Sequence, residues 1–74
     1  MRVGPVPTEV GQRVRCLWAD GYNFTEGREY SVTGYQPAQQ MHGAGGFTFP
    51  AYVHVIDDTG ITVICHASRF EVIQ

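Results

Sequence analysis

The sequence predicts an all-β fold, a small barrel of five short strands with a one-turn helix before the last strand. Two observations lead to this prediction. β-Branched and aromatic residues alternate with polar ones in short runs, and Gly, Asp and Pro turn signals separate these runs. No segment has the period of a helix of several turns. In 74 residues, a short sheet curled on itself buries one face and removes open edges.

The clearest element is a hairpin over residues 52–66, with strands rich in Val, Ile and Thr. Asp57-Asp58-Thr59-Gly60 is its turn, and Gly60 supplies the positive φ that closes a three-residue loop with a bulge. Pairing of Asp57 with Ile61 sets the register. One side then carries Val53, Val55, Val63 and Cys65, and the other carries Tyr52, His54, Ile56, Thr62, Ile64 and His66.

The first 12 residues predict an extended lead-in, because Pro5 and Pro7 exclude a helix or a central strand. We expect Val3, Val6 or Val10 to pin it to the barrel. Residues 13–74 form the barrel. The first strand covers residues 13–19, and its inward positions are Val14, Cys16 and Trp18. Leu17 breaks the polar outer pattern of Arg13 and Arg15, which indicates a bulge.

A loop over residues 20–29 follows, and its lone apolar residue Phe24 is expected to pack on the core. The second strand covers residues 30–35, with Tyr30 and Val32 inward and a bulge or a bend at Gly34. Residues 36–50 predict a flexible, Gly-rich loop without an apolar period. After the hairpin, residues 67–70 predict a single helical turn and residues 70–73 the last strand.

This order of parts is that of an SH3-like barrel. Moreover, the runs VRCL, TEGREYSV, YVHVIDDTG and SRFEVI resemble a pattern in small bacteriophage and prophage proteins, which are thought to form such barrels. The runs begin at Val14, Thr25, Tyr52 and Ser68, and the resemblance departs at residues 36–50. It implies a phage accessory protein in the cytoplasm of a bacterial host, of a kind often used to bind and disable a host protein.

Composition narrows the classes of partner. The formal charge is −2, and all five basic residues are arginines, so the dense cationic surface of a sequence-blind nucleic-acid binder is missing. The N-terminus has no long apolar run, which predicts neither a signal peptide nor a membrane span. Cys16 and Cys65 are expected to be buried free thiols rather than a disulfide, since nothing marks the chain as secreted.

No set of reactive groups is expected to converge. His54 and His66 share a face, but Cys65 points away from it and His42 lies in the loop. Only two ligands then converge, whereas a structural zinc site needs four. Adjacent Cys65 and His66 cannot pair as nucleophile and base. Asp57 and Asp58 are turn residues. Type II dihydrofolate reductases share this fold, but the Gln and Tyr of their ligand-binding strand are missing from residues 60–66. We therefore predict no enzyme activity, cofactor or metal.

The aromatic residues outnumber what so small a core needs, so part of them should lie exposed. Trp and Tyr anchor protein interfaces, and SH3-like barrels bind partners, proline-rich peptides among them, through such side chains. The alternative is that Trp18 and Phe49 fill the barrel ends. The predicted partner-binding residues are Trp18, Tyr22, Tyr35, Met41, Phe47, Phe49 and Tyr52.

The sequence thus predicts a non-enzymatic module that binds and inhibits a host bacterial protein, in host takeover or anti-defence. The alternatives are a nucleic-acid-binding barrel that uses Arg13 and Arg15, and a self-associating structural protein that pairs through an open strand. The chain is expected to be a monomer or a small homo-oligomer without a membrane partner.

Overall fold

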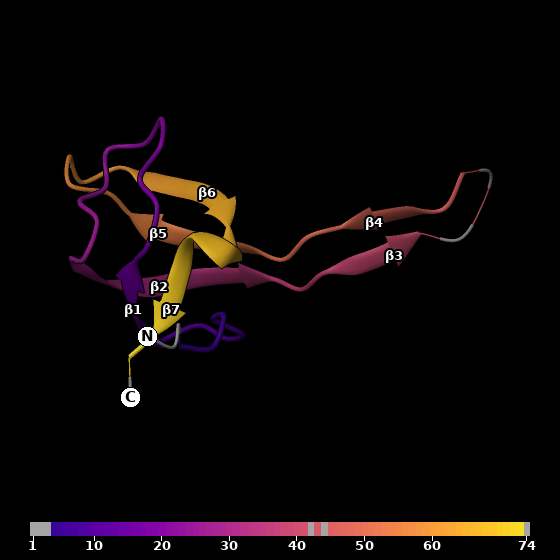
Figure 1. Cartoon of the computed structure of the whole chain (residues 1–74), viewed down its shortest axis with the longest axis horizontal. Coiled ribbons are helices and arrows are strands. Elements are labelled where there is room, and N and C mark those ends of the chain that lie inside the picture. Colours follow the sequence, from indigo (N-terminus) through magenta and orange to yellow (C-terminus); the bar gives the residue numbers. More distant parts are fainter. Residues whose placement is uncertain (1–3, 42, 44, 74) are drawn as a thin grey trace.

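The computed structural model describes residues 4–41, 43 and 45–73, without the side chains of Met41 and Phe47. The described elements are short strands and one 3-10 turn (Figure 1). In chain order they are β1 (Arg13–Cys16), β2 (Glu29–Gln36), β3 (Gln39–Met41), β4 (Phe47–Phe49), β5 (Tyr52–Ile56), β6 (Thr62–His66), η1 (Ala67–Arg69) and β7 (Phe70–Val72). The described residues include no helix long and apolar enough to cross a bilayer.

Five of these strands form one antiparallel sheet in the order β6-β5-β2-β1-β7. The sheet folds over itself, so that inward side chains from all five strands pack into one core. The 3-10 turn precedes the last strand, and the prediction of a small five-stranded SH3-like barrel is confirmed. The buried core residues are Val14, Cys16, Phe24, Tyr30, Val32, Val53, Val55, Cys65, Ala67 and Phe70.

The β5–β6 hairpin has the predicted register, from Tyr52 opposite His66 to Ile56 opposite Thr62. The N–H of Asp57 donates to the carbonyl of Ile61 at 2.9 Å, and Gly60 closes the turn at φ 86°. Because side chains alternate across a strand, this register places Val53, Val55 and Cys65 in the core.

The first strand is shorter than predicted, and Trp18 does not point inward. β1 ends at Cys16, after which the backbone N–H groups of Leu17 and Trp18 both donate to the carbonyl of Arg69, at 2.7 and 3.4 Å. Two successive donors on one acceptor break the alternation of the strand, as at a bulge. Trp18 is therefore 52% exposed.

The lead-in is held to the barrel by a proline rather than by a valine. Pro7 is fully buried, whereas Val6 and Val10 are exposed, and Val3 lies outside the described residues. The carbonyl of Pro5 accepts from the N–H of Val72 at 2.8 Å. Proline buries its ring without needing a hydrogen-bond partner for an N–H, which suits it to this position.

The prediction of a loop without regular structure over residues 36–50 is wrong for Gln39–Met41 and Phe47–Phe49. These segments are β3 and β4, and they pair antiparallel as a second, two-stranded sheet. Figure 1 shows this sheet projecting away from the barrel, beyond the ends of β2 and β5. We call residues 37–50 the arm. Its strands were missed because each is only three residues long, and Gln39–Met41 contains no β-branched or aromatic residue.

Candidate binding surface

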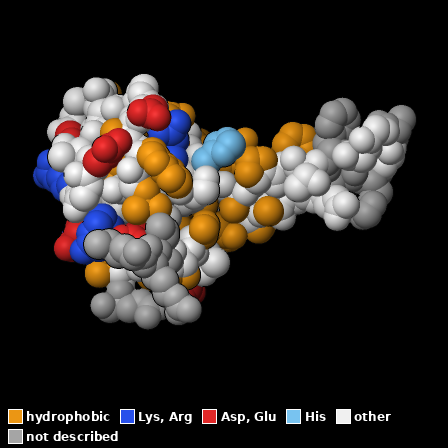
Figure 2. All heavy atoms as spheres, viewed as in Figure 1, with side chains coloured by type: hydrophobic (Ala, Val, Ile, Leu, Met, Phe, Trp, Pro, Cys, Tyr) orange, Lys and Arg blue, Asp and Glu red, His pale blue; other side chains and the backbone are white. Residues whose placement is uncertain are grey.

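An apolar groove lies where the arm leaves the barrel. It has a volume of about 450 Å³, within the range of small-ligand and peptide pockets. Figure 2 shows hydrophobic side chains gathered at this junction, while the charged side chains visible in the same view lie on the barrel. The groove is lined by Tyr35, Gln36, Pro37, Gln39, Phe49, Pro50 and Tyr52.

The geometry of the groove follows from two prolines on facing segments. The β2–β5 ladder ends with Gln36 opposite Tyr52, and the β3–β4 ladder begins with Gln39 opposite Phe49. Pro37 and Pro50 lie between the two ladders. A proline has no N–H to donate to a ladder, so the paired strands separate there and the aromatic side chains border a hollow.

A second, more polar hollow of about 370 Å³ lies on the barrel itself. It is lined by Trp18, Asp20, His66, Ser68 and Arg69. The guanidinium of Arg69 donates to the carbonyl of Trp18 at 3.2 Å and lies 4.5 Å from the centre of the Tyr22 ring. This cation–π contact and the hydrogen bond together hold Arg69 in one orientation.

The two hollows meet at one aromatic contact. Tyr52 lines the apolar groove and His66 lines the polar hollow, and their rings pack edge to face at 5.0 Å. They are opposite each other in the β5–β6 register. The groove and the hollow are therefore neighbouring parts of one surface, apolar at the arm and polar at Trp18. We call this the aromatic surface.

The structure brings together most of the predicted partner-binding residues whose side chains it describes. Tyr35, Phe49 and Tyr52 line the groove, Trp18 lines the polar hollow, and Tyr22 lies against Arg69. Met41 and Phe47 oppose each other in the β3–β4 ladder, and their side chains lie outside the described part of the chain.

Sequence reasoning missed Pro37, Pro50, His66 and Arg69 as members of this surface. One signal could have located the groove: the sequence has no Asp, Glu, Lys or Arg between Glu29 and Asp57. An uncharged stretch of that length, interrupted by prolines and rich in aromatic residues, is unusual for a solvent-exposed loop.

The other described arginines are neutralised by carboxylates. Arg13 pairs with Glu29 at 3.3 Å, and Arg15 pairs with Glu71 at 3.3 Å. Arg28 pairs with Asp58 at 3.1 Å. Across residues 4–41, 43 and 45–73, Arg69 alone has no such ion pair. An arginine whose charge is balanced by a carboxylate attracts a phosphate group less strongly. The ion pairs of Arg13 and Arg15 therefore do not favour the alternative of a nucleic-acid-binding barrel.

Within the described residues, no group of three or more His, Cys, Asp or Glu side chains could hold a metal ion. His54 and His66 share one face as predicted, and His42 lies outside those residues. Cys65 faces the core, and burial raises the pKa of its thiol to about 11. Burial also raises the pKa of Cys16, and both thiols are free, which agrees with the interpretation preferred from the sequence.

His54 has an unusual environment on the outer side of β5. A Cβ atom added to Gly34 would lie 2.6 Å from Cγ and Nδ1 of the imidazole, so the ring lies directly over the backbone of Gly34. Its Nε2 atom is buried and has no hydrogen-bond partner among the described residues. Of the bulge or bend predicted at Gly34, the structure shows the bulge, since the β2–β5 register shifts between Val32 and Gly34.

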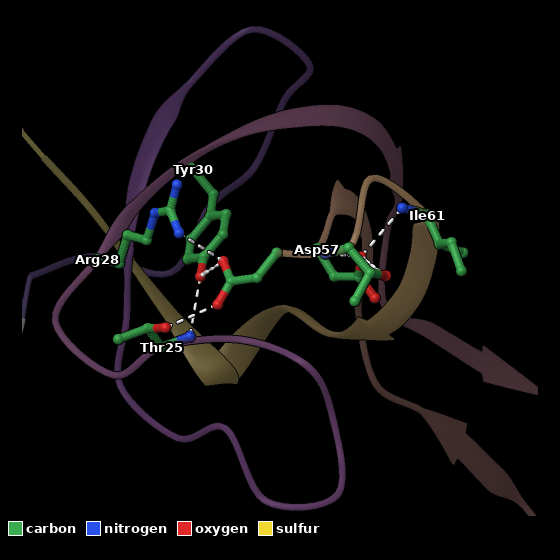
Figure 3. A network of polar contacts seen from close by, with 7 residues as sticks. Thr25, Arg28, Tyr30, Asp57 and Ile61 are labelled. Carbon is green, nitrogen blue, oxygen red and sulfur yellow. Dashed lines mark hydrogen bonds and ion pairs between the residues drawn. The ribbon is translucent and has the colours of Figure 1, made fainter.

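The two turn carboxylates are fully engaged in structural hydrogen bonds (Figure 3). Asp57 accepts from the Thr59 hydroxyl at 2.6 Å, from the Thr59 N–H at 2.9 Å and from the Ile61 N–H at 3.0 Å. The hydroxyl bond is the main reason that the pKa of Asp57 lies below its usual value. Asp57 is therefore a turn residue, as predicted, and its carboxylate stabilises its own turn.

Asp58 joins the turn to the first loop instead. It accepts from the Tyr30 hydroxyl at 2.6 Å, from the Thr25 hydroxyl at 2.7 Å and from Arg28 at 3.1 Å. The Tyr30 hydroxyl in turn accepts from the Thr25 N–H at 2.9 Å. These bonds, that from Tyr30 first, hold the pKa of Asp58 below its usual value. The cluster, which Figure 3 shows around Thr25, Arg28 and Tyr30, anchors the first loop to the barrel.

Comparison of the chain with protein-family models, with curated proteins and with solved structures found no match.

Proposed function

We propose that the chain is a non-enzymatic protein-binding module, and that its aromatic surface holds an extended apolar segment of a partner protein. The observation that carries the proposal is the convergence of Tyr35, Phe49 and Tyr52 on one groove, continuous through His66 with the hollow at Trp18. Aromatic side chains in a preformed groove supply large contact area at a small cost in conformational entropy.

The composition of the groove supports a peptide as the bound group. Aromatic and proline rings provide apolar walls, while the amides of Gln36 and Gln39 can donate to and accept from a peptide backbone. The residues that line the apolar groove are all uncharged, so a bound segment should be uncharged where it meets the groove.

The resemblance to phage accessory proteins supports a protein of the bacterial host as the partner, with inhibition of that protein as the consequence. Occupation of a host surface needs no catalytic residues, and a small stable barrel with an exposed aromatic surface is suited to it.

The test is affinity capture from a bacterial lysate at physiological salt with three tagged forms of the chain. Tyr52→Ala removes a wall of the groove, and Ile61→Ala removes an apolar side chain that is 62% exposed at the opposite end of the β5–β6 hairpin. We expect one protein to be enriched by the wild-type and Ile61→Ala forms and lost with Tyr52→Ala.

That protein, once purified, should bind the wild-type chain directly, with an affinity at least about tenfold higher than for Tyr52→Ala, which corresponds to about 1.4 kcal/mol. Thermal unfolding of each variant checks that the barrel is intact. The proposal fails if no protein is enriched, or if Tyr52→Ala and wild type capture the same protein equally.

A further inference from the structure

The arm is a two-stranded sheet that stands apart from the barrel. Its strands pair only with each other, with Gln40 opposite Thr48 at the centre. Pro37 and Pro50 interrupt the ladder that would otherwise join β3 and β4 to the main sheet. An isolated two-stranded hairpin is at best marginally stable in water, and three or more strands are needed for independent stability.

Both outer edges of the arm lack the charged side chains that protect many edge strands against strand pairing. Exposed edge strands in natural proteins commonly carry charges, especially lysine, which prevent another chain from adding to the sheet. Between Glu29 and Asp57 the sequence has no charged residue of this kind. Thr48 and Phe49 are both exposed.

The sequence of β4 matches itself in antiparallel pairing. Phe47-Thr48-Phe49 reads the same in both directions. A two-fold axis through Thr48 would place Thr48 beside Thr48 of a second copy, and each Phe49 position opposite a Phe47 position. Thr–Thr and aromatic pairs are favourable across antiparallel strands. β3, with the sequence Gln39-Gln40-Met41, has no such symmetry.

We propose that two copies of this chain associate through β4 of their arms, in antiparallel register centred on Thr48. The result is a four-stranded sheet in the order β3-β4-β4-β3, with one self-complementary, two-fold symmetric interface. Because the arms then point in opposite directions, the two barrels lie at opposite ends, and the segment between Glu29 and Asp57 that contains the interface has no Asp, Glu, Lys or Arg. The net charge of −2 on each chain therefore opposes the association only weakly.

A second copy is favoured over an unrelated strand by two features: the palindromic strand and the absence of any charge that would select an oppositely charged partner. Phe49 belongs both to β4 and to the lining of the apolar groove, whereas Thr48 does not line the groove. A substitution at Thr48 therefore tests the association separately from the proposed function.

The test measures molar mass by sedimentation equilibrium over a wide range of concentrations. The wild-type chain should pass from one to two copies as its concentration rises. Thr48→Lys and Thr48→Glu each place like charges opposite each other at the two-fold axis, so each alone should raise the dimer dissociation constant at least about tenfold. An equimolar mixture of the two variants should dimerise again, because opposite charges then face each other.

Thr62→Lys is the matched control, since it adds the same charge to an exposed position on β6 and should dimerise as wild type does. Near-ultraviolet circular dichroism should show the same barrel in every variant, because Thr48 lies outside the core. A wild-type chain that stays monomeric at the highest concentration overturns the proposal. So does a dimer that survives Thr48→Lys, or a Lys and Glu mixture that stays monomeric.

Discussion

The hydroxyl of Tyr30 donates a 2.6 Å hydrogen bond to Asp58 and accepts one from the N–H of Thr25 at 2.9 Å. Tyr30 is a core residue of β2, while Asp58 lies in the β5–β6 turn. One phenol therefore links the core, the first loop and the hairpin turn.

Replacement of Tyr30 by Phe keeps the packing of the ring and removes both hydrogen bonds. We expect the free energy of unfolding to fall by about 1 kcal/mol, the usual net contribution of such bonds. Urea unfolding followed by tryptophan fluorescence measures the change. Tyr22→Phe is the control, because none of the hydrogen bonds among the described residues involves the Tyr22 hydroxyl, and it should unfold as wild type does. An unchanged stability of Tyr30→Phe would show that water replaces these bonds without cost.

The turn carboxylates predict an acid-sensitive barrel. The pKa values of Asp57 and Asp58 lie below the ordinary value of 3.8 in the folded chain, so folding favours their charged forms. Their stabilising contribution is complete above that value and is lost as the pH falls through the lowered, folded-state values. Urea midpoints measured between about pH 6 and pH 2.5 should therefore decline below about pH 4.

The urea midpoint of the Asp58→Asn variant should fall less than that of wild type over the same pH range, because one of the two carboxyl groups no longer titrates. Asp20→Asn is the matched control, since Asp20 is exposed and its carboxylate accepts no hydrogen bond from the described residues. Equal acid sensitivity of wild type and Asp58→Asn would contradict the assignment of the effect to this turn.

The two buried thiols should be unreactive in the folded chain. The thiolate is the reactive form, and burial raises the pKa of Cys65 to about 11. A thiol-reactive reagent at about pH 8 should label neither Cys16 nor Cys65 in native conditions and both in denaturant. Glutathione, a small exposed thiol, provides the reference rate. Rapid labelling of the native chain, or a denatured chain without free thiols, would contradict the buried free-thiol structure.

Gly34 should be sensitive to the smallest substitution because of His54. A Cβ atom on residue 34 would lie 2.6 Å from the imidazole, which is closer than any ordinary contact. We expect Gly34→Ala to lower the free energy of unfolding by about 1–3 kcal/mol, as overpacking does. The same substitution in a His54→Ala background should cost clearly less, and this double-mutant cycle isolates the contact. Equal costs in both backgrounds would place the strain in the backbone instead.

Trp18 gives a direct signal for binding at the aromatic surface. It is the single tryptophan of the chain and is 52% exposed beside His66 and Arg69. A partner segment that reaches this hollow should bury the indole and shift its emission to shorter wavelength. Titration with the purified partner measures the shift, and Trp18→Phe, monitored by calorimetry, serves as the control for the signal. Binding without any shift would confine the partner to the groove at the arm.

Sequence reasoning located the barrel, but it recognised the aromatic surface only as a set of residue types. Tyr35, Phe49 and Tyr52 could be selected because they are aromatic residues beyond the needs of a small core. Their convergence depends on the separation of two strand pairs at Pro37 and Pro50, which lie 13 positions apart in the sequence and on facing segments. Arg69 joined the surface through the bulge at Leu17, which also turned Trp18 outward.

By itself, the sequence determined the alternation of inward and outward side chains, the β5–β6 register and the turn at Gly60. These depend on interactions within one strand or between neighbours along the chain, so a local pattern carries them. Only the tertiary structure decided that Gln39–Met41 and Phe47–Phe49 pair as a projecting sheet, that Trp18 is exposed and that Asp58 binds Tyr30. The exposure of Trp18 and the bond from Tyr30 to Asp58 depend on contacts between segments far apart in the chain, where the partner's position rather than the residue's own preference sets the outcome. The two arm strands are close in sequence, but at three residues each they are too short to show a pattern.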